Sequence, residues 1–224
     1  MAIELIKHNP EWGDLFKREA KKIKAALGET CYAVCHIGST AVRSLHARPI
    51  IDIMAVVDSF ASLEEHHKKL IDLGYQLLGE ETTAICHTYA KRDGIACKLV
   101  IFEKSNELDI ARRIAFRNYL SARHEVAAQY DVLRRTLAEE CSDVRSYYEK
   151  RNVFIEENEK RALAWQKRQD RQFNHLLTGI VFCVGVGSLL GMALSDFSTG
   201  MCIGVCIGAV VGIGMSMFDK NREG

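Results

Sequence analysis

One long apolar stretch near the carboxyl end limits what this chain can fold into more than any other feature. The 43 residues from Leu176 to Phe218 contain a single charged side chain, Asp196, although 26% of the whole chain is charged. A run of this length is typical of membrane-spanning helices, and the alternative is a pair of helices buried in a soluble domain. The sequence therefore divides into a charged part, 1–175, and an apolar part, 176–218.

The apolar part is long enough for two membrane spans. Residues 176–194 and 201–218 are 19 and 18 residues long without a charge. At ~1.5 Å per residue each span covers roughly 27 to 29 Å, close to the ~30 Å hydrocarbon core of a bilayer. The short link between them makes the spans antiparallel, so 176–218 is predicted to be a two-helix transmembrane hairpin.

Basic residues flank both outer ends of this hairpin. They lie in a predicted basic juxtamembrane helix, 165–175, which we expect to continue from the preceding domain, and in the tail, 219–224. The link carries only Asp196. By the positive-inside rule, the amino-terminal domain and the tail are predicted to be cytoplasmic, in a multi-pass membrane protein; the basic residues are Lys167, Arg168, Arg171, Lys220 and Arg222.

Glycines repeat at four-residue intervals in the hairpin and give each helix one smooth face. Such faces let helix backbones approach closely in lipid. They either pack the hairpin on itself or build a homo-oligomer, and the spacing leaves both possibilities open. A soluble pair of helices is disfavoured, because Gly costs ~1 kcal/mol relative to Ala in a helix. The predicted helix-packing residues are Gly187, Gly191, Gly200, Gly204, Gly208 and Gly212.

The charged part is nearly neutral overall. Residues 1–175 carry 28 Lys and Arg against 26 Asp and Glu. A nucleic-acid partner is therefore not indicated, since such a domain is usually strongly basic. The odd number of cysteines in this part fits free, buried thiols better than disulfides or a zinc site.

Apolar patterns interrupted by Gly and Pro predict strands first and helices last in the charged part. We expect helices over 11–27 and 63–73. From 108 to 175 the pattern is helical, with three helices expected. The fold class is therefore α+β. Strands are expected over 31–37, 49–57, 84–89 and 96–102, the last two joined by a hairpin turn at 91–94.

The segment from His36 to Met54 carries the candidate site. A strand ends in Gly38 and Ser39, a short turn follows, and the next strand carries Asp52. Gly38 would let backbone N–H groups approach phosphate oxygens, Ser39 would donate a hydroxyl, and a helix amino terminus would favour the anion. This arrangement is typical of nucleotidyltransferase folds, which hold a phosphate chain near a metal.

Two parts of this segment together resemble a family signature. They read His-Ile-Gly-Ser-Thr-Ala-Val over 36–42 and Arg-Pro-Ile-Ile-Asp-Ile over 48–53. This signature is similar to that of the GrpB family, small proteins with a nucleotidyltransferase-like fold. The resemblance extends over roughly 3–164 and includes Asn9-Pro10-Glu11-Trp12 and Phe116-Arg117-Asn118-Tyr119-Leu120. It implies a nucleotidyltransferase-like mixed sheet flanked by helices for residues 1–164.

The chain also departs from the family's pattern. Arg43-Ser44 stands where the family has Pro-Gly, and Asn118 stands where it has Asp. The family's His-Leu-His strand reads Lys98-Leu99-Val100, which removes two possible metal ligands. Lys98 is a cation suited to an anion rather than to a metal.

Metal-dependent nucleotidyl transfer needs carboxylates that converge on one or two Mg²⁺ or Mn²⁺ ions. In the active fold the second carboxylate lies two residues after the first, on the same strand face. Here that residue is Met54, which cannot bind a hard cation. Asp58 is roughly 20 Å from Asp52 along an extended strand at ~3.3 Å per residue, and Glu103 could approach only from the hairpin. Asp52 is therefore the single candidate for both catalysis and metal binding.

Three functions remain open. The sequence favours a domain that binds a nucleotide or another phosphorylated ligand beside the membrane and has lost its catalytic carboxylates. An active metal-dependent nucleotidyltransferase is the second possibility, and a membrane-tethered scaffold with a vestigial pocket is the third. His46, His66 and His67 are expected at the surface. The candidate ligand-binding residues are His36, Gly38, Ser39, Thr40, Arg48, Lys98, Arg117 and Lys150.

Overall fold

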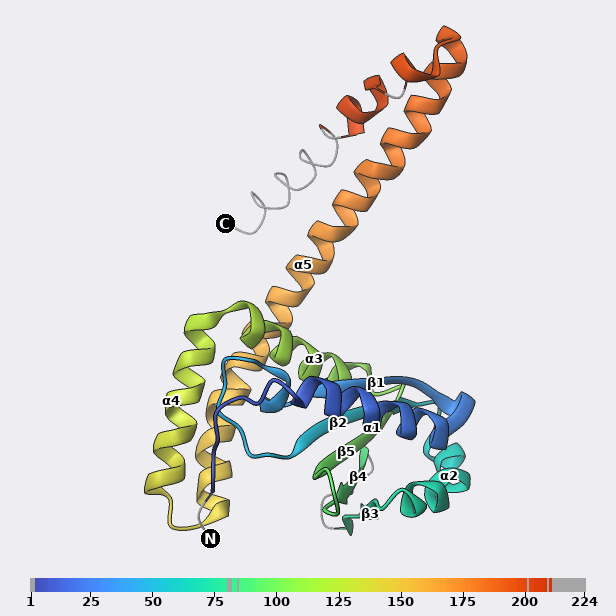
Figure 1. The fold of residues 1–224 in the computed structure, drawn as a ribbon. Helices are drawn as coiled ribbons and strands as arrows, with labels where there is room; N and C mark the ends of the chain where they lie inside the picture. Colours follow the sequence, from blue (N-terminus) through green and yellow to red (C-terminus); the bar gives the residue numbers. More distant parts are fainter. Residues whose placement is uncertain (1–2, 80–81, 84, 201, 209, 211–224) are drawn as a thin grey trace. The chain divides into compact units, whose positions relative to one another are not determined.

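The structure is a computed structural model that describes residues 3–79, 82–83, 85–200, 202–208 and 210. The chain divides into two compact units, Met1–Leu163 and Ala164–Gly224. In the first unit all the strands precede the last three helices, as predicted, while one α-helix comes before the strands and another between them (Figure 1). Its elements are α1 (Trp12–Leu27), η1 (Gly28–Thr30), β1 (Cys31–Ile37), η2 (Ser39–Ala41), β2 (Ile51–Val57), α2 (Phe60–Asp72), β3 (Gln76–Leu77), β4 (Cys86–Lys91), β5 (Cys97–Glu103), α3 (Glu107–Ala122) and α4 (His124–Glu140); α5 (Val144–Leu194) begins there and continues into the second unit.

The strands form one mixed sheet in the order β1-β2-β5-β4-β3. Strand β2 pairs antiparallel with β1 and parallel with β5. The predicted hairpin between β4 and β5 is confirmed, with Lys91 opposite Cys97 and Gly94 at φ +75° in the turn. The α+β class is confirmed, while the sequence did not predict the two-residue strand β3 or the short helix η1.

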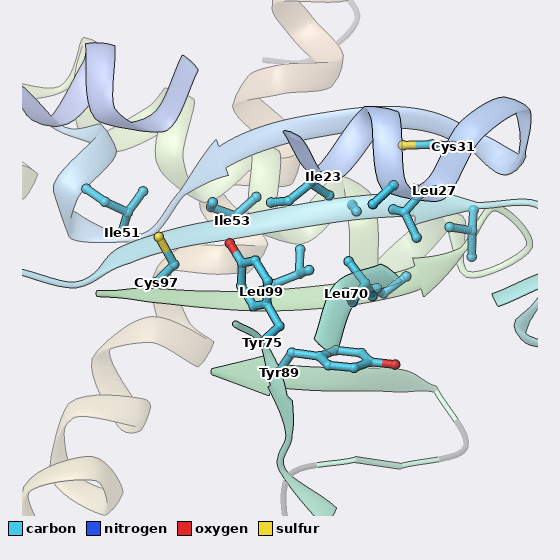
Figure 2. Close-up of a cluster of buried hydrophobic side chains, with 14 of the residues drawn as sticks. Ile23, Leu27, Cys31, Ile51, Ile53, Leu70, Tyr75, Tyr89, Cys97 and Leu99 are labelled. Atoms are coloured by element: carbon cyan, nitrogen blue, oxygen red, sulfur yellow. The ribbon is translucent and has the colours of Figure 1, made fainter. Parts of the chain in front are cut away.

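One face of the sheet is covered by α1 and α2. Ile51 and Ile53 of β2 point to this face and belong to one buried cluster with Ile23 of α1 and Leu70 of α2 (Figure 2). Their alternation along β2 places them on one side of the strand. Burying each of these side chains contributes roughly 1.5–3 kcal/mol, so this cluster is the main apolar core of the domain.

The opposite face of the sheet carries a smaller apolar cluster under α3. Met54 of β2 is fully buried there, together with Ile37, Val100 and Phe102. Ile110 and Ile114 of α3 pack against them. Strand β2 is therefore covered on both faces, which explains its almost continuous apolar sequence.

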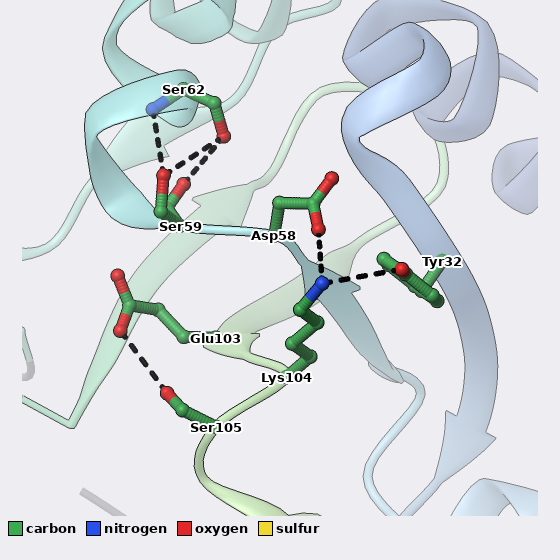
Figure 3. A network of polar contacts seen from close by, with 7 residues as sticks. All are labelled: Tyr32, Asp58, Ser59, Ser62, Glu103, Lys104 and Ser105. Atoms are coloured by element: carbon green, nitrogen blue, oxygen red, sulfur yellow. Dashed lines mark hydrogen bonds and ion pairs between the residues drawn. The ribbon is translucent and has the colours of Figure 1, made fainter.

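Polar contacts gather where the carboxyl ends of β2 and β5 meet the start of α2 (Figure 3). Ser59 caps this helix, since its Oγ accepts a hydrogen bond from the Ser62 N–H at 3.3 Å. The Glu103 carboxylate accepts a bond from the Phe60 N–H at 2.6 Å. Asp58 forms an ion pair with Lys104 Nζ at 2.7 Å. Both carboxylates are therefore engaged at this end of the sheet.

The second unit contains the apolar helices. In the described part of the chain, the helix over Val144–Ala193 is long and apolar enough to cross a membrane, and only 19% of its most apolar 18-residue window is buried. The helix over Phe197–Gly208 is also apolar but shorter. Met201, residues 211–218 of the predicted second span with Gly212, and the predicted tail 219–224 lie outside the described residues.

Glycines of these two helices face each other within the unit. A Cβ built on Gly204 would lie 2.7 Å from the Gly187 nitrogen, and one on Gly200 would lie 2.7 Å from the Gly187 oxygen. A Cβ on Gly191 would lie 3.0 Å from Phe197 Cα, and one on Gly208 would lie 2.5 Å from the Gly179 oxygen. The close approach of the two backbones therefore depends on the missing side chains.

A buried ion pair connects α1 to β4. Glu19 is fully buried, and its carboxylate receives Lys91 Nζ at 2.7 Å and Lys22 Nζ at 3.4 Å. Burial alone would raise the pKa of Glu19, but the hydrogen bond and the charge of Lys91, with the help of Lys22, lower it below its usual range. The charge of Glu19 inside the core is thus stabilised mainly by Lys91.

We therefore expect Lys91→Met to lower the free energy of unfolding by about 3 kcal/mol, because it leaves a buried carboxylate with the longer ion pair to Lys22, at 3.4 Å. Urea denaturation of the full-length protein in mild detergent at pH 7.5, followed by tryptophan fluorescence, measures the change. Lys68→Met on the exposed face of α2 is the control, with a change below about 0.5 kcal/mol. Equal losses for the two variants would contradict this account.

Candidate ligand-binding site

The turn after β1 is shaped by Gly38. This residue has φ +70° and ψ −168°, a backbone conformation that is essentially restricted to glycine. A Cβ at this position would also lie 2.8 Å from Cγ of Asp52. Gly38 is therefore required twice, for its conformation and for the close approach of the Asp52 carboxylate. Ser39 begins the short helix η2 immediately afterwards.

The register of three strands fixes the surroundings of Asp52. Asp52 on β2 lies opposite Ile37 on β1 and opposite Lys98 on β5. Paired residues on neighbouring strands point to the same face, so Asp52 and Lys98 emerge side by side on the face that carries α3. The predicted relation between the Gly-Ser turn and Asp52 is present in the structure.

A cavity of about 270 Å³ opens beside Asp52 and lies entirely within the unit Met1–Leu163. It is lined by the turn after β1, the segment before β2, and residues of β2, β5, α3, α4 and α5. Two acidic side chains, Asp52 and Glu159, line it. The six basic side chains in its wall are Arg48, Lys98, Arg113, Arg117, Arg134 and Arg151.

The charge of Asp52 is under two opposing influences. Burial raises the pKa of the Asp52 carboxyl above its usual range. The positive charges of Lys98, Arg48, Arg134 and Arg151 act in the opposite direction and favour the ionised form. The same cations favour any other anion that enters the cavity.

Neutral groups hold the arginines in place. Arg117 donates to the backbone oxygen of His36 at 2.9 Å and to Asn118 Oδ1 at 2.7 Å. Arg134, which is only 5% exposed, donates to the backbone oxygen of His46 at 2.7 Å. Because these partners carry no net charge, they orient the two guanidinium groups without neutralising them.

Tyr148 holds two further arginines by its ring. The guanidinium carbons of Arg48 and Arg151 lie 5.8 and 4.6 Å from the ring centroid, within the range of cation–π contacts. Arg151 also donates to Asn152 Oδ1, and its Nε is buried without a hydrogen-bond partner in the part of the chain that the structure describes.

Six of the predicted site residues line this cavity, and three do not. His36, Thr40 and Lys150 are the exceptions. The His36 ring bonds to Thr40 Oγ1 at 3.0 Å and stacks on Phe16, and Thr40 itself is buried. Lys150 is exposed on α5. The six that line the cavity are Gly38, Ser39, Arg48, Asp52, Lys98 and Arg117.

His36 is therefore a structural residue and not part of the cavity wall. Burial, with smaller contributions from the charges of Arg117 and His8, lowers its pKa to about 4. A neutral ring suits its contacts with Phe16 and Thr40. Its connection to the cavity is through its backbone oxygen, which holds Arg117.

Three other histidines, expected at the surface, are only partly exposed and make contacts there. All three are half-buried. His46 bonds to the Asp131 carboxylate through its backbone N–H at 2.6 Å and its ring at 2.9 Å. The His67 ring lies 3.1 Å from the Tyr89 hydroxyl, while His66 Nδ1 is buried. Asp131 thereby fixes the His46 carbonyl that holds Arg134.

Sequence reasoning missed most of the cavity's helical wall. The missing cations are Arg113 on α3, Arg134 on α4 and Arg151 on α5. On α5 the lining residues recur every four positions at Arg151, Ile155 and Glu159, after Tyr147 and Tyr148. This helical spacing was a usable signal, and it separates Arg151 from its neighbour Lys150.

The carboxylates around Asp52 do not fit a divalent metal. Met54, in the place of the second carboxylate, is buried among apolar side chains. Asp58 and Glu103 are engaged at the other end of the strands, as Figure 3 shows. Glu159 receives Arg112 at 2.6 Å. The described residues contain no cluster of three or more His, Cys, Asp or Glu suited to a metal.

The chain thus contains a small α+β domain, built on a mixed five-stranded sheet, with a cation-lined cavity at the glycine turn. The model of the GrpB protein family matches residues 2–161, and the chain belongs to this family. A UPF0157 protein of Halalkalibacterium halodurans is 35% identical over 164 residues, which are 73% of this chain and 84% of that protein. The resemblance found in the sequence is thus confirmed.

A solved structure of the same family agrees with this assignment. The conserved protein GrpB from Enterococcus faecalis has a TM-score of 0.68 and 30% identity, over 73% of this chain and 99% of that chain. The Cid1 poly(U) polymerase with Mg and 3′-dATP bound has a TM-score of 0.45 and 13% identity, over 60% of this chain and 43% of that chain. A likeness that remote says nothing about the chemistry of this chain.

We expect Gly38→Ala to lower the free energy of unfolding by about 3 kcal/mol, because it strains the backbone and also displaces the Asp52 carboxylate. Gly94→Ala is the matched control. Gly94 also has a positive φ, but a Cβ there would meet nothing within 4 Å, so only the backbone strain of about 1 kcal/mol is expected. Urea denaturation compares the two, and equal losses would contradict the proposed contact.

Proposed function

We propose that the GrpB-like domain binds a nucleotide or another phosphorylated small molecule in the cavity beside Asp52. The observation that carries this proposal is the convergence of six basic side chains, against two acidic ones, on one cavity of about 270 Å³. Pockets for small ligands usually occupy roughly 300–1,000 Å³, so the size is close to that of a small phosphorylated ligand. A cavity with this charge would favour anions.

The types of cation support a phosphate ligand in particular. Five of the six are arginines, whose planar guanidinium groups donate two parallel hydrogen bonds to phosphate oxygens. Gly38 and Ser39 lie in the same wall and would supply a backbone without side-chain hindrance and a hydroxyl donor. Guanidinium, backbone N–H and hydroxyl groups would all bind phosphate in a domain that catalyses no reaction.

Active nucleotidyl transfer is the second candidate, and Asp52 is the observation that favours it. Its carboxylate stands beside the glycine turn, where such an enzyme would hold a metal ligand. The reaction also requires a further carboxylate for Mg²⁺ or Mn²⁺, and Met54 occupies that place. We therefore propose binding without transfer.

A substitution in the cavity tests the binding proposal. We expect Arg151→Gln to weaken the binding of ATP and GTP about tenfold, since a hydrogen bond to a charged group contributes roughly 1.5–3 kcal/mol. Lys150→Gln removes the same charge from the adjacent, exposed position and should leave affinity unchanged. Isothermal titration calorimetry on the full-length protein in mild detergent measures both.

Two results would count against this proposal. The first is the absence of heat with every nucleotide, which would favour a scaffold with a vestigial pocket. The second is transfer of label from radiolabelled ATP, GTP or CTP to a cell-extract component with Mg²⁺ or Mn²⁺, with loss of this activity in Asp52→Asn, which would establish the enzyme.

We further propose that residues 176–218 anchor the domain in a membrane as an antiparallel hairpin, with the domain and the tail 219–224 in the cytoplasm. The low burial of the apolar window supports this proposal. Large apolar side chains are exposed along the described part of the segment, including Val181, Leu189, Met192 and Val210. The glycine contacts between Gly187 and Gly204 support packing of the hairpin on itself, which leaves a homo-oligomer as the alternative.

This anchor predicts that the protein stays in the membrane pellet after alkaline carbonate extraction. Gly204→Leu should make the hairpin more sensitive to protease in mild detergent, because the leucine collides with Gly187. Gly185→Leu is the control, since a Cβ there meets nothing within 4 Å. Release into the carbonate supernatant would overturn the anchor. A smaller particle for Gly204→Leu than for the parent on size exclusion would favour the homo-oligomer.

A further inference from the structure

We propose that this cavity binds a metal-free oligophosphate, a chain of two or more phosphate groups, with its arginines supplying the positive charge that a divalent cation supplies in a nucleotidyl-transfer site. This inference rests on the proposed binding function and names the chemical class of its ligand. It follows from four features: the carboxylates, the partners of the arginines, the spread of the cations and the state of the aromatic rings.

The first feature is the poor fit to a metal. A hard cation such as Mg²⁺ takes oxygen ligands and usually bridges protein carboxylates to substrate phosphates. Asp52 lines the cavity, but the neighbouring strand position on the same face is Met54, fully buried against Ile110 and Ile114. The second carboxylate of the cavity, Glu159, is held by Arg112 at 2.6 and 2.9 Å. Neither complements Asp52 as a metal ligand.

The second feature is that neutral partners orient the arginines without neutralising their positive charge. Arg117 and Arg134 are fixed by backbone oxygens at 2.9 and 2.7 Å. Arg48 and Arg151 lie against the Tyr148 ring. All of these partners are neutral. Such prealigned donors bind an anion with little further ordering, which lowers the entropic cost of binding.

The third feature is the distribution of the cations around the cavity. Lys98 comes from β5, Arg48 from the segment before β2, and the other four arginines from α3, α4 and α5. A single phosphate group has four oxygens and cannot accept paired hydrogen bonds from all six cations. A chain of phosphates can contact several of them at once, so affinity should rise with the number of phosphates.

The fourth feature is that the aromatic rings of the cavity already have partners. Tyr130 stacks on Phe154 with centroids 5.1 Å apart and meets the edge of Phe116 at 5.7 Å. Tyr148 contacts Tyr147 as well as the two arginines. These contacts give a nucleobase little to stack on. The phosphates, rather than the base, are therefore the part of the ligand that the cavity recognises.

Asp52 has an unusual role in this arrangement. Its carboxylate adjoins Gly38, where phosphate oxygens would approach, and in its ionised form it repels them when no metal lies between. A metal site would lose affinity on removal of this charge. A metal-free site would keep or gain affinity, and this difference separates the two mechanisms.

The experiment is isothermal titration calorimetry on the full-length protein in mild detergent, with inorganic phosphate, pyrophosphate and tripolyphosphate. Each probe is titrated once with EDTA and once with excess Mg²⁺. We expect tripolyphosphate to bind at least about tenfold more tightly than phosphate in EDTA, and excess Mg²⁺ to weaken it at least about threefold, because the magnesium complex carries less negative charge. ATP, GTP and CTP should bind with similar affinities.

Two variants complete the test. Asp52→Asn should leave tripolyphosphate binding in EDTA at least as tight as in the parent, because a metal-free site does not need this carboxylate. Burial raises the pKa of Asp52, so the affinity rises only to the extent that the carboxyl is ionised and repels phosphate. Arg151→Gln should weaken it, with Lys150→Gln as the control. Thermal melting of each variant without ligand checks that it is folded.

The outcomes distinguish the two proposals. Binding that requires Mg²⁺, or that is lost in Asp52→Asn, would overturn the metal-free inference and leave the binding function intact. Equal affinity for phosphate and tripolyphosphate would overturn the preference for a chain. No binding of any phosphate compound or nucleotide would overturn the binding function and the inference together.

Discussion

The site depends on one close contact, between the backbone of Gly38 and the side chain of Asp52. The pairing of Ile37 with Asp52 carries the turn after β1 directly past the carboxylate, and a side chain at residue 38 would occupy the same space. The register of β5 then places Lys98 beside Asp52. A slip of β2 by one residue would move Asp52 into the apolar core under α1 and α2, so the core fixes the site.

Much of this arrangement could be predicted because its residues lie close together in the sequence. The apolar run of β1 ends at Gly38, and the next apolar run carries Asp52 near its start. Local patterns are therefore sufficient to place both residues at the same end of two neighbouring strands. Lys98 could be predicted as a site residue for the same reason, because it is a charged residue within an otherwise apolar strand. The loss of the second carboxylate was also readable, since Met54 stands two residues from Asp52.

The helical wall could not be predicted in the same way. Arg113, Arg134 and Arg151 lie on three different helices, and only packing decides which helix faces converge. Lys150 and Arg151 are one residue apart, yet this step rotates a side chain by about 100° around the helix, from the solvent to the cavity. The direction of the His36 ring could not be predicted either, because its contacts with Phe16 of α1 and Thr40 of η2 depend on packing.

The cavity holds its positive charge at some cost to the folded domain. Six like charges repel one another, two carboxylates do not balance them, and the neutral partners of the arginines fix their directions without reducing the repulsion. The apolar clusters on the two faces of the sheet supply the stability that tolerates this repulsion. A bound polyanion relieves it, so ligand binding and the stability of the fold are linked. The apolar clusters thus stabilise a fold that its charged cavity destabilises. Residues that oppose folding are expected where they serve a functional site.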